Sequence, residues 1–290
     1  MQEVSFLSLV PHLKALALSF FDKTNSISQG AHAGFRKGYE DQLIEYRHYV
    51  PGDDLRYLDW RLYSRTDKYY IREGYQRSKQ RVFIWLDTSM SMRFDQNKFN
   101  VTWLLALGLA FLYRAQNDTV LFFLERGQHN KPEVIEIKGA HDFIRLNDFF
   151  LNTNIPRSDK MLPVDEALNQ ARIRLKSSNK VFWLTDMYVP IDDFKQVLDQ
   201  SMQHRYNLAV LHLVGQQEWA SSKKKKGFFS KLVDSETGDW LSSTHLQNYD
   251  TVWDEAVDLR ARLLLARGCR YLRGQVEEGP LRILAGLGGL

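Results

Sequence analysis

From Gln80 onward, short apolar runs alternate with stretches of helical periodicity, and this alternation restricts the chain to few folds. The run at 81–86 (RVFIWL) is apolar after its first residue and rich in β-branched and aromatic side chains, which is typical of a strand buried on both faces. Comparable runs begin at Thr119, Val181 and Tyr206, and helical patterns separate them. Such alternation builds β-α-β units. We therefore predict an α/β fold with a mostly parallel, doubly wound sheet, in which the Val82 and Val181 strands are parallel neighbours.

The first part of the chain has a different character. Between residues 6 and 21 the apolar side chains fall on one helical face, which predicts a helix docked on the main body rather than a membrane anchor. Residues 28–78 are dense in Tyr, Arg, Asp and Gly and lack helical periodicity, so short strands and turns are expected. Within them, the aromatic and basic tract Tyr63–Tyr75 could stack nucleic-acid bases, but its alternation favours a half-buried strand.

These patterns divide the chain into two expected parts. Residues 1–79 form an N-terminal helix and a β-rich segment packed on the main domain, and residues 80–290 form the main domain. Near 215–245 we expect a hairpin insertion, because Leu232-Val233 and Trp240-Leu241 flank a turn sequence.

Composition excludes several classes of function. Lys and Arg total 39 against 35 Asp and Glu, so the net charge of +4 provides no strong field for nucleic acid or membrane. The run Lys223–Lys226 is interpreted as a solvated loop, with peripheral membrane contact at most. Cys269 is the single cysteine, which indicates a reducing compartment, and we expect a cytoplasmic protein. No zinc-binding spacing and no phosphate-binding glycine loop occurs, so any ATP hydrolysis has to come from a partner.

Candidate functional residues follow two of the predicted strands. Asp87, Ser89 and Ser91 come directly after the first strand, and Asp186 ends a later one. Carboxylate and hydroxyl oxygens are ligands for a hard cation such as Mg²⁺, and neighbouring parallel strands end at the same edge of a sheet. An alternative stays open, in which the same residues cap the turns and helices that follow. A metal-dependent hydrolase with Asp87 or Asp186 as base is a further alternative, but no histidine or additional acidic cluster adjoins either strand end.

The Asp87-x-Ser89-x-Ser91 pattern resembles the metal-ion-dependent adhesion site of von Willebrand factor A domains. The stretch 45–60, EYRHYVPGDDLRYLDW, is similar to a signature of the bacterial domain of unknown function 58 family, and Asp234-x-Glu236-Thr237-Gly238 is similar to a further family element. The signature residues are Arg47, Tyr49, Gly52, Asp53, Asp54, Arg56, Asp59 and Trp60.

This resemblance implies a von Willebrand factor A-like fold and association with MoxR-type AAA+ ATPases that act on a client protein. It implies a non-catalytic protein-binding module whose metal captures a partner carboxylate. One departure concerns the threonine that normally completes the adhesion site, because Leu162 and Pro163 stand there and neither Thr153 nor Ser158 has the right spacing. We therefore expect Mg²⁺ to bind weakly or not at all in the isolated protein.

The signature segment also carries a dense group of charges. Asp53, Asp54, Arg56, Asp59 and Arg61 could form an exposed recognition surface or an ion-pair lattice that pins the segment to the main domain. Arg56 and Asp59 flank apolar residues, which favours the lattice for these two.

Overall fold

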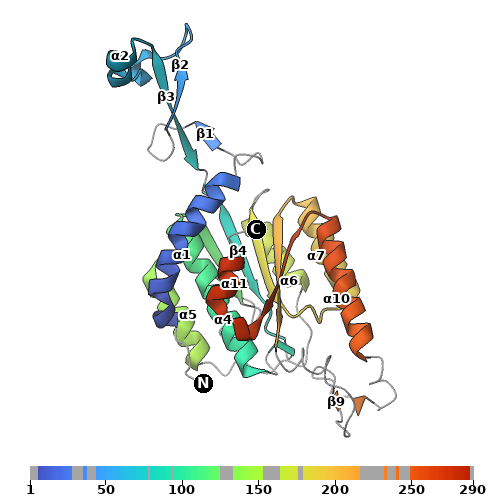
Figure 1. Ribbon diagram of the computed structural model, residues 1–290. Coiled ribbons are helices and arrows are strands. Elements are labelled where there is room, and N and C mark those ends of the chain that lie inside the picture. The colour runs from blue at the N-terminus through green and yellow to red at the C-terminus, as the bar shows by residue number, and fades with distance from the viewer. Residues whose placement is uncertain are drawn as a thin grey trace. The chain divides into compact units, whose positions relative to one another are not determined.

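A computed structural model describes most of the chain as two compact units (Figure 1). One unit comprises Met1–Lys23 and Gln80–Leu290, and the other comprises Thr24–Lys79. The structure describes residues 6–27, 35–37, 44–77, 79–89, 91–92, 95–124, 133–152, 164–175, 179–215, 232–233, 240–241 and 249–287.

A six-stranded sheet forms the centre of the larger unit, in the order β11-β8-β7-β4-β5-β6. Its strands are β4 (Arg81–Leu86), β5 (Thr119–Leu124), β6 (Glu133–Ile137), β7 (Lys180–Thr185), β8 (Asn207–Val214) and β11 (Arg270–Gln275). Neighbouring strands are parallel except for β6, which runs antiparallel to β5 at the sheet edge. Phe83 of β4 lies opposite Val181 of β7, so the predicted parallel pairing of these two strands is confirmed.

Helices cover both faces of the sheet. Val82, Ile84 and Leu86 of β4 point into one apolar core, and Phe83 and Trp85 point into another, as expected of a strand buried on both sides. The first core is completed by residues of α1 (Phe6–Ile27), α4 (Gln96–Ala115), α5 (Ala140–Asn152) and α11 (Pro280–Leu287). The second is completed by residues of α6 (Val164–Arg174), α7 (Ile191–Gln203) and α10 (Tyr249–Ala266).

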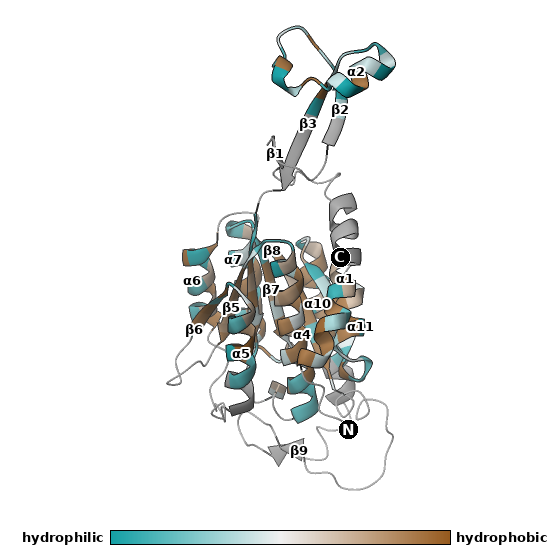
Figure 2. Ribbon diagram, turned by 90° about the vertical axis from the view of Figure 1, so that its left-hand side faces the viewer, coloured by the Kyte–Doolittle hydropathy of each residue, from teal (hydrophilic) through white to brown (hydrophobic). Residues whose placement is uncertain are grey.

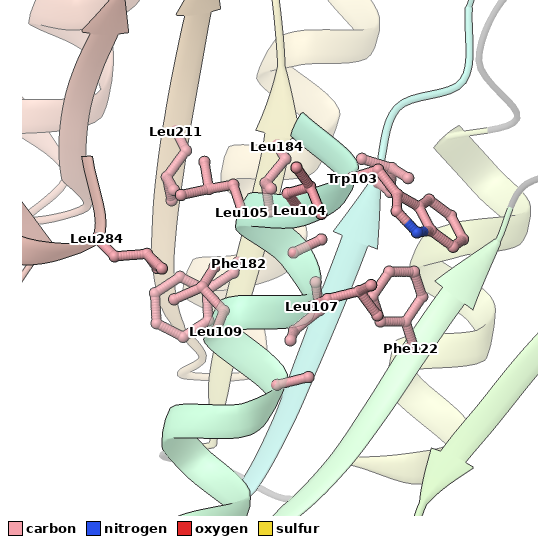
Figure 3. Close-up of a cluster of buried hydrophobic side chains, with 14 of the residues drawn as sticks. Trp103, Leu104, Leu105, Leu107, Leu109, Phe122, Phe182, Leu184, Leu211 and Leu284 are labelled. Carbon is pink, nitrogen blue, oxygen red and sulfur yellow. The ribbon is translucent and has the colours of Figure 1, made fainter. Parts of the chain in front are cut away.

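The helix α4 is buried on nearly all sides. In Figure 2 apolar residues run along α4 and the strands beside it. Figure 3 shows Trp103 and Phe122 side by side, with ring centroids 5.6 Å apart, and Leu105 directed toward Leu184 and Leu211. The carboxylate of Asp95 accepts the backbone N–H of Asn97 at 2.9 Å and caps the helix N-terminus.

The smaller unit is built on a hairpin. β3 (Tyr70–Arg77) pairs antiparallel with β1 (Phe35–Lys37) and with β2 (Ile44–His48). The connection from β2 to β3 contains the short 3-10 helix η1 (Leu55–Tyr57) and the helix α2 (Trp60–Thr66). In the described part of 28–78, the predicted short strands and turns are present, but two helices that were not predicted lie between them.

The predicted strand at Tyr63–Tyr75 is wrong in its first half. The carboxylate of Asp59 accepts the backbone N–H groups of Arg61 at 3.0 Å and Leu62 at 2.9 Å, and so starts α2 instead. The helix ends at Asp67, whose φ of 54° is left-handed, and the strand begins at Tyr70.

Several expectations concern the remaining segments. β9 (Leu232–Val233) and β10 (Trp240–Leu241) pair antiparallel, as the hairpin prediction requires. The lysine run at 223–226, the element at 234–238 and Leu162 with Pro163 lie outside the described residues. Within the parts that the structure describes, no helix is long and apolar enough to cross a membrane.

Candidate functional site

The candidate residues lie where the connections after β4 and β7 diverge to opposite faces of the sheet. α4 follows β4 and packs on one face, whereas α7 follows β7 and packs on the other. The backbone N–H of Asp87 donates to the carbonyl of Leu184 at 3.0 Å and extends the pairing beyond the end of β4. In open α/β sheets this position outside the carboxyl ends of the strands is the usual place for a ligand.

Asp87 is tied to the neighbouring strand. The hydroxyl of Thr185 donates to Asp87 Oδ2 at 2.6 Å, and the backbone N–H of Ser89 donates to Oδ1 at 2.9 Å. Thr185 Oγ1 in turn accepts the backbone N–H of Met187 at 3.0 Å. Burial, and then the negative charge of Asp186, raises the pKa of Asp87 to about 6.

The two serines face each other. Ser89 Oγ and Ser91 Oγ are 3.0 Å apart and share one hydrogen bond. Each residue is 8% exposed, against 1% for Asp87 and for Asp186. All four residues of the predicted site are therefore buried, and the two serines are slightly less so than the two acids.

Asp186 is paired with a lysine that sequence reasoning did not single out. Lys98, in the first turn of α4, is fully buried, and its Nζ lies 2.8 Å from Asp186 Oδ2 and 3.4 Å from the carbonyl of Ser91. Asp186 Oδ1 accepts the backbone N–H of Tyr188 at 3.2 Å. A signal existed, because the first turn of a helix that follows a parallel strand lies near the carboxyl end of that strand.

Together these residues form what we call the strand-end cluster, defined as Asp87, Ser89, Ser91, Lys98, Thr185 and Asp186. It contains all four residues of the predicted site. The capping alternative holds for the turns only, since Asp87 and Asp186 each accept the backbone N–H two residues later. The helices that follow are not capped by them, because α4 is capped by Asp95 and α7 begins after Pro190 without a side-chain cap.

A buried histidine adjoins the cluster, although none is near either strand end in the sequence. His212 of β8 lies opposite Thr185 in the strand register, and its Nδ1 is 2.9 Å from the hydroxyl of Tyr271. Burial lowers the pKa of His212 to about 3, so the imidazole is neutral near pH 7.

The signature residues organise the loop that precedes α2. Arg47 donates to both carboxylate oxygens of Asp53 at 2.6 Å. The Asp53 N–H bonds the Val50 carbonyl at 3.0 Å and closes a turn in which Gly52 has a φ of 107°, a conformation that favours glycine.

The remaining signature charges have local roles. Arg56 pairs with Asp54 at 2.6 Å and its side chain is 80% exposed, whereas Asp59 caps α2. Tyr49 lies with its ring centroid 6.2 Å from that of Tyr69, and Trp60 is 62% exposed. These contacts join residues of the smaller unit to one another.

Comparison with known proteins places the chain in a family. Residues 45–245 match the family described as "Protein of unknown function DUF58". This chain belongs to the DUF58 family.

Relatives of the DUF58 chain include uncharacterized proteins Mb1516 of Mycobacterium bovis and Rv1480 of Mycobacterium tuberculosis. Each is 30% identical over 86 residues, which span 30% of this chain and 27% of the relative. The chain thus matches about a quarter of the length of these relatives. A similar solved structure is the conserved hypothetical protein BatB from Bacteroides thetaiotaomicron, with 13% identity, a TM-score of 0.37, and coverage of 72% of this chain and 96% of that one.

In the strand-end cluster of this DUF58 protein, the acids are engaged by donors of the protein itself. Mg²⁺ requires six oxygen ligands in near-octahedral geometry. Both oxygens of Asp87 accept hydrogen bonds from the protein, and Asp186 Oδ2 is bound by the Lys98 ammonium. Within the described parts of the chain, no group of three or more His, Cys, Asp or Glu residues could hold a metal. Thr153 and Ser158, the alternative ligands, lie outside those parts.

Proposed function

We propose that this DUF58 protein is a non-catalytic protein-binding module that docks a partner at the edge of the sheet formed by the strand-end cluster. The supporting observation is the chain of contacts that joins β4, β7 and α4 beneath the hydroxyls of Ser89 and Ser91. Such a chain fixes two adjacent donor-acceptor groups on a rigid base, and recognition through hydrogen bonds requires this pre-organisation.

The state of the two acids favours binding over hydrolysis. A general base needs a lone pair within reach of a substrate proton or a water molecule. Asp87 already accepts hydrogen bonds from Thr185 and from the Ser89 N–H, and Asp186 is ion-paired with Lys98, so both acids have partners within the protein. Both acids are 1% exposed, whereas Ser89 and Ser91, at 8%, are the least buried residues of the predicted site.

The identity of the partner comes from the resemblance. Proteins of this type associate with MoxR-type AAA+ ATPases, and the chain lacks a phosphate-binding glycine loop of its own. We therefore propose a von Willebrand factor A-like adaptor in the cytoplasm, which works with a MoxR-type ATPase in the maturation or remodelling of a client protein.

The test targets the hydroxyls, because truncation of the buried Asp87 would also disturb the fold. We expect the double variant Ser89→Ala/Ser91→Ala to lose capture of the MoxR-type ATPase from the same organism, measured by co-purification with the tagged chain. Its free energy of unfolding should fall by about 1–2 kcal/mol, since the hydrogen bonds of the Ser89 hydroxyl with Ser91 and with Asp87 are lost.

Ser64→Ala provides the matched control, because this serine lies in α2 and donates to the carbonyl of Arg61, outside the cluster. The control should capture the ATPase as the wild type does. Full capture by the double variant would remove the support for docking at this edge.

A further inference from the structure

We propose that Lys98 is the resident cation of the strand-end cluster, so that its ammonium group takes the place of a divalent metal ion and the docking edge assembles without metal. This inference rests on the proposed function for its biological meaning, but its physical content concerns the cluster alone.

The charge balance of the cluster is the first argument. Lys98 Nζ lies 2.8 Å from Asp186 Oδ2, and the two side chains are 0% and 1% exposed. A close buried pair of this kind satisfies the carboxylate with an opposite charge, where the attraction is much less screened than in water. A Mg²⁺ ion approaching Asp186 would meet the positive charge of the ammonium beside it.

The position of the ammonium is the second argument. Its contact to the carbonyl of Ser91, at 3.4 Å, joins the loop after β4 to the acid at the end of β7. These are the two chain segments that a cation at this edge would bridge. Lys98 Nζ also lies over the ring of Tyr188, 6.0 Å from the ring centroid, a distance at which a cation-π contact forms.

The lysine is held firmly in place, which is the third argument. It lies in the first turn of α4, and its carbonyl accepts the hydroxyl of Thr102 at 2.7 Å within the helix. The preceding residues are fixed by the Asp95 cap, and the following ones are buried in the core. A fully buried side chain on such a helix cannot swing into solvent to make room for an ion.

The chemistry of recognition follows from this substitution. An ammonium neutralises the acid and orients the loop, as a metal ion would, but it has no open coordination position for a carboxylate from another protein. Partner contact is then made by the hydroxyls of Ser89 and Ser91 through hydrogen bonds, and a chelator should leave capture unchanged.

Magnesium titration tests the inference directly. Wild-type protein, Lys98→Met and Lys98→Met/Asp186→Asn are titrated with MgCl₂ into the millimolar range, with KCl at matched ionic strength as the control. Binding is followed by titration calorimetry and by the thermal unfolding midpoint. Methionine replaces the lysine stem at similar length without its charge, and the double variant also lacks the charged acceptor.

We expect no saturable response to Mg²⁺ in the wild type. In Lys98→Met, Asp186 is left without a cation, so Mg²⁺ should raise the unfolding midpoint saturably, and this rise should vanish in the double variant. A folded Lys98→Met protein that ignores Mg²⁺ would show that the ammonium does not stand in for a metal ion.

Saturable Mg²⁺ binding by the wild type that is lost in Asp186→Asn would overturn the inference, and this comparison decides the matter even if Lys98→Met fails to fold. The result is separate from that of the serine variants. If the protein without both hydroxyls still captures the ATPase, the docking proposal is refuted and the role of Lys98 is unaffected. If the wild type binds Mg²⁺ saturably through Asp186, the role of Lys98 is refuted and the docking proposal is unaffected.

Discussion

Buried charges define the strand-end cluster at the scale of single residues, and Lys98 and Asp186 illustrate their energetics. Removing one partner of a buried ion pair costs about 3–5 kcal/mol, because the other charge is left without compensation. We expect this loss for Lys98→Met in urea unfolding. Asp186→Asn in the Lys98→Met background should recover part of it, since it removes the stranded charge. Additive losses in the double variant would mean that the two side chains do not interact.

Asp87 provides a prediction about pH. Its pKa rises from 3.8 to about 6 on folding, because burial and the charge of Asp186 disfavour its ionised form. Between about pH 4 and 6 the unfolded chain therefore loses this proton first, and the stability contributed by the group falls as the pH rises. Above pH 6, ionisation of Asp87 lowers the free energy of unfolding by roughly 3 kcal/mol relative to its value below pH 4.

Asp87→Asn isolates this effect. The amide keeps an acceptor for the Ser89 N–H but cannot ionise, so the stability of the variant relative to wild type should increase from pH 4 to 6 in urea titrations. The stability of the variant is compared with that of the wild type because the contribution of His212 to stability changes with pH in the opposite direction. Its pKa is lowered to about 3, so its contribution rises with pH up to the ordinary histidine value. The charge of Asp186, which acts on Asp87, is present in both proteins. A pH-independent difference would contradict the raised pKa.

The sequence revealed the acids and the serines of the cluster but not the lysine. Asp87 and Asp186 end apolar strands, and parallel neighbours bring such ends to one edge, so their proximity follows from topology. Lys98 stands near the start of a helix, where a charged residue ordinarily faces solvent. Its inward orientation depends on α4 being buried on nearly all sides, which helical periodicity alone does not reveal.

Helix α1 shows at the scale of elements how a segment distant in sequence joins the core. Leu13 is fully buried beside residues of α4 and α11, whereas Leu7 in the same helix is 69% exposed. We expect Leu13→Ala to lower the free energy of unfolding by about 2–5 kcal/mol, through lost burial and the cavity left behind.

Leu7→Ala removes the same atoms from the same helix and should change the unfolding free energy by less than about 0.5 kcal/mol. Both values come from urea denaturation. Equal effects of the two substitutions would mean that α1 is not docked through its Leu13 face.

Elements with strong apolar periodicity or continuity were predictable, and those that depend on local hydrogen bonds were not. α2 starts because the Asp59 carboxylate binds two backbone N–H groups, and the tract that follows alternates aromatic and charged residues like a strand. In α5, Asp142 likewise accepts the backbone N–H groups of Lys138 at 2.8 Å and Gly139 at 3.1 Å. These hydrogen bonds determine where a helix begins, and they are not visible in the pattern of apolar residues.

At the scale of the whole molecule, the two units differ in how much apolar surface they bury. The larger unit has two cores, one on each face of its sheet. Where side chains of the smaller unit are described, its buried apolar residues are Leu58 and Ile71, which face each other across an isolated β-bridge. A hairpin with so small a core has little stability of its own.

Hydrogen exchange should therefore separate the units. We expect the amides of β2 and β3 to exchange through local openings of much lower free energy than those of β4 and β7, which should require unfolding of the sheet. Ile71→Ala removes one of the two buried apolar side chains and should lower the stability of the smaller unit by about 2 kcal/mol or more. Amide exchange in β2 and β3 should then be faster by roughly tenfold or more. Exchange in β4 and β7 should stay unchanged. Trp60→Ala serves as the control, because that side chain is 62% exposed. Equal acceleration in both sets of strands would mean that the molecule unfolds as one cooperative unit.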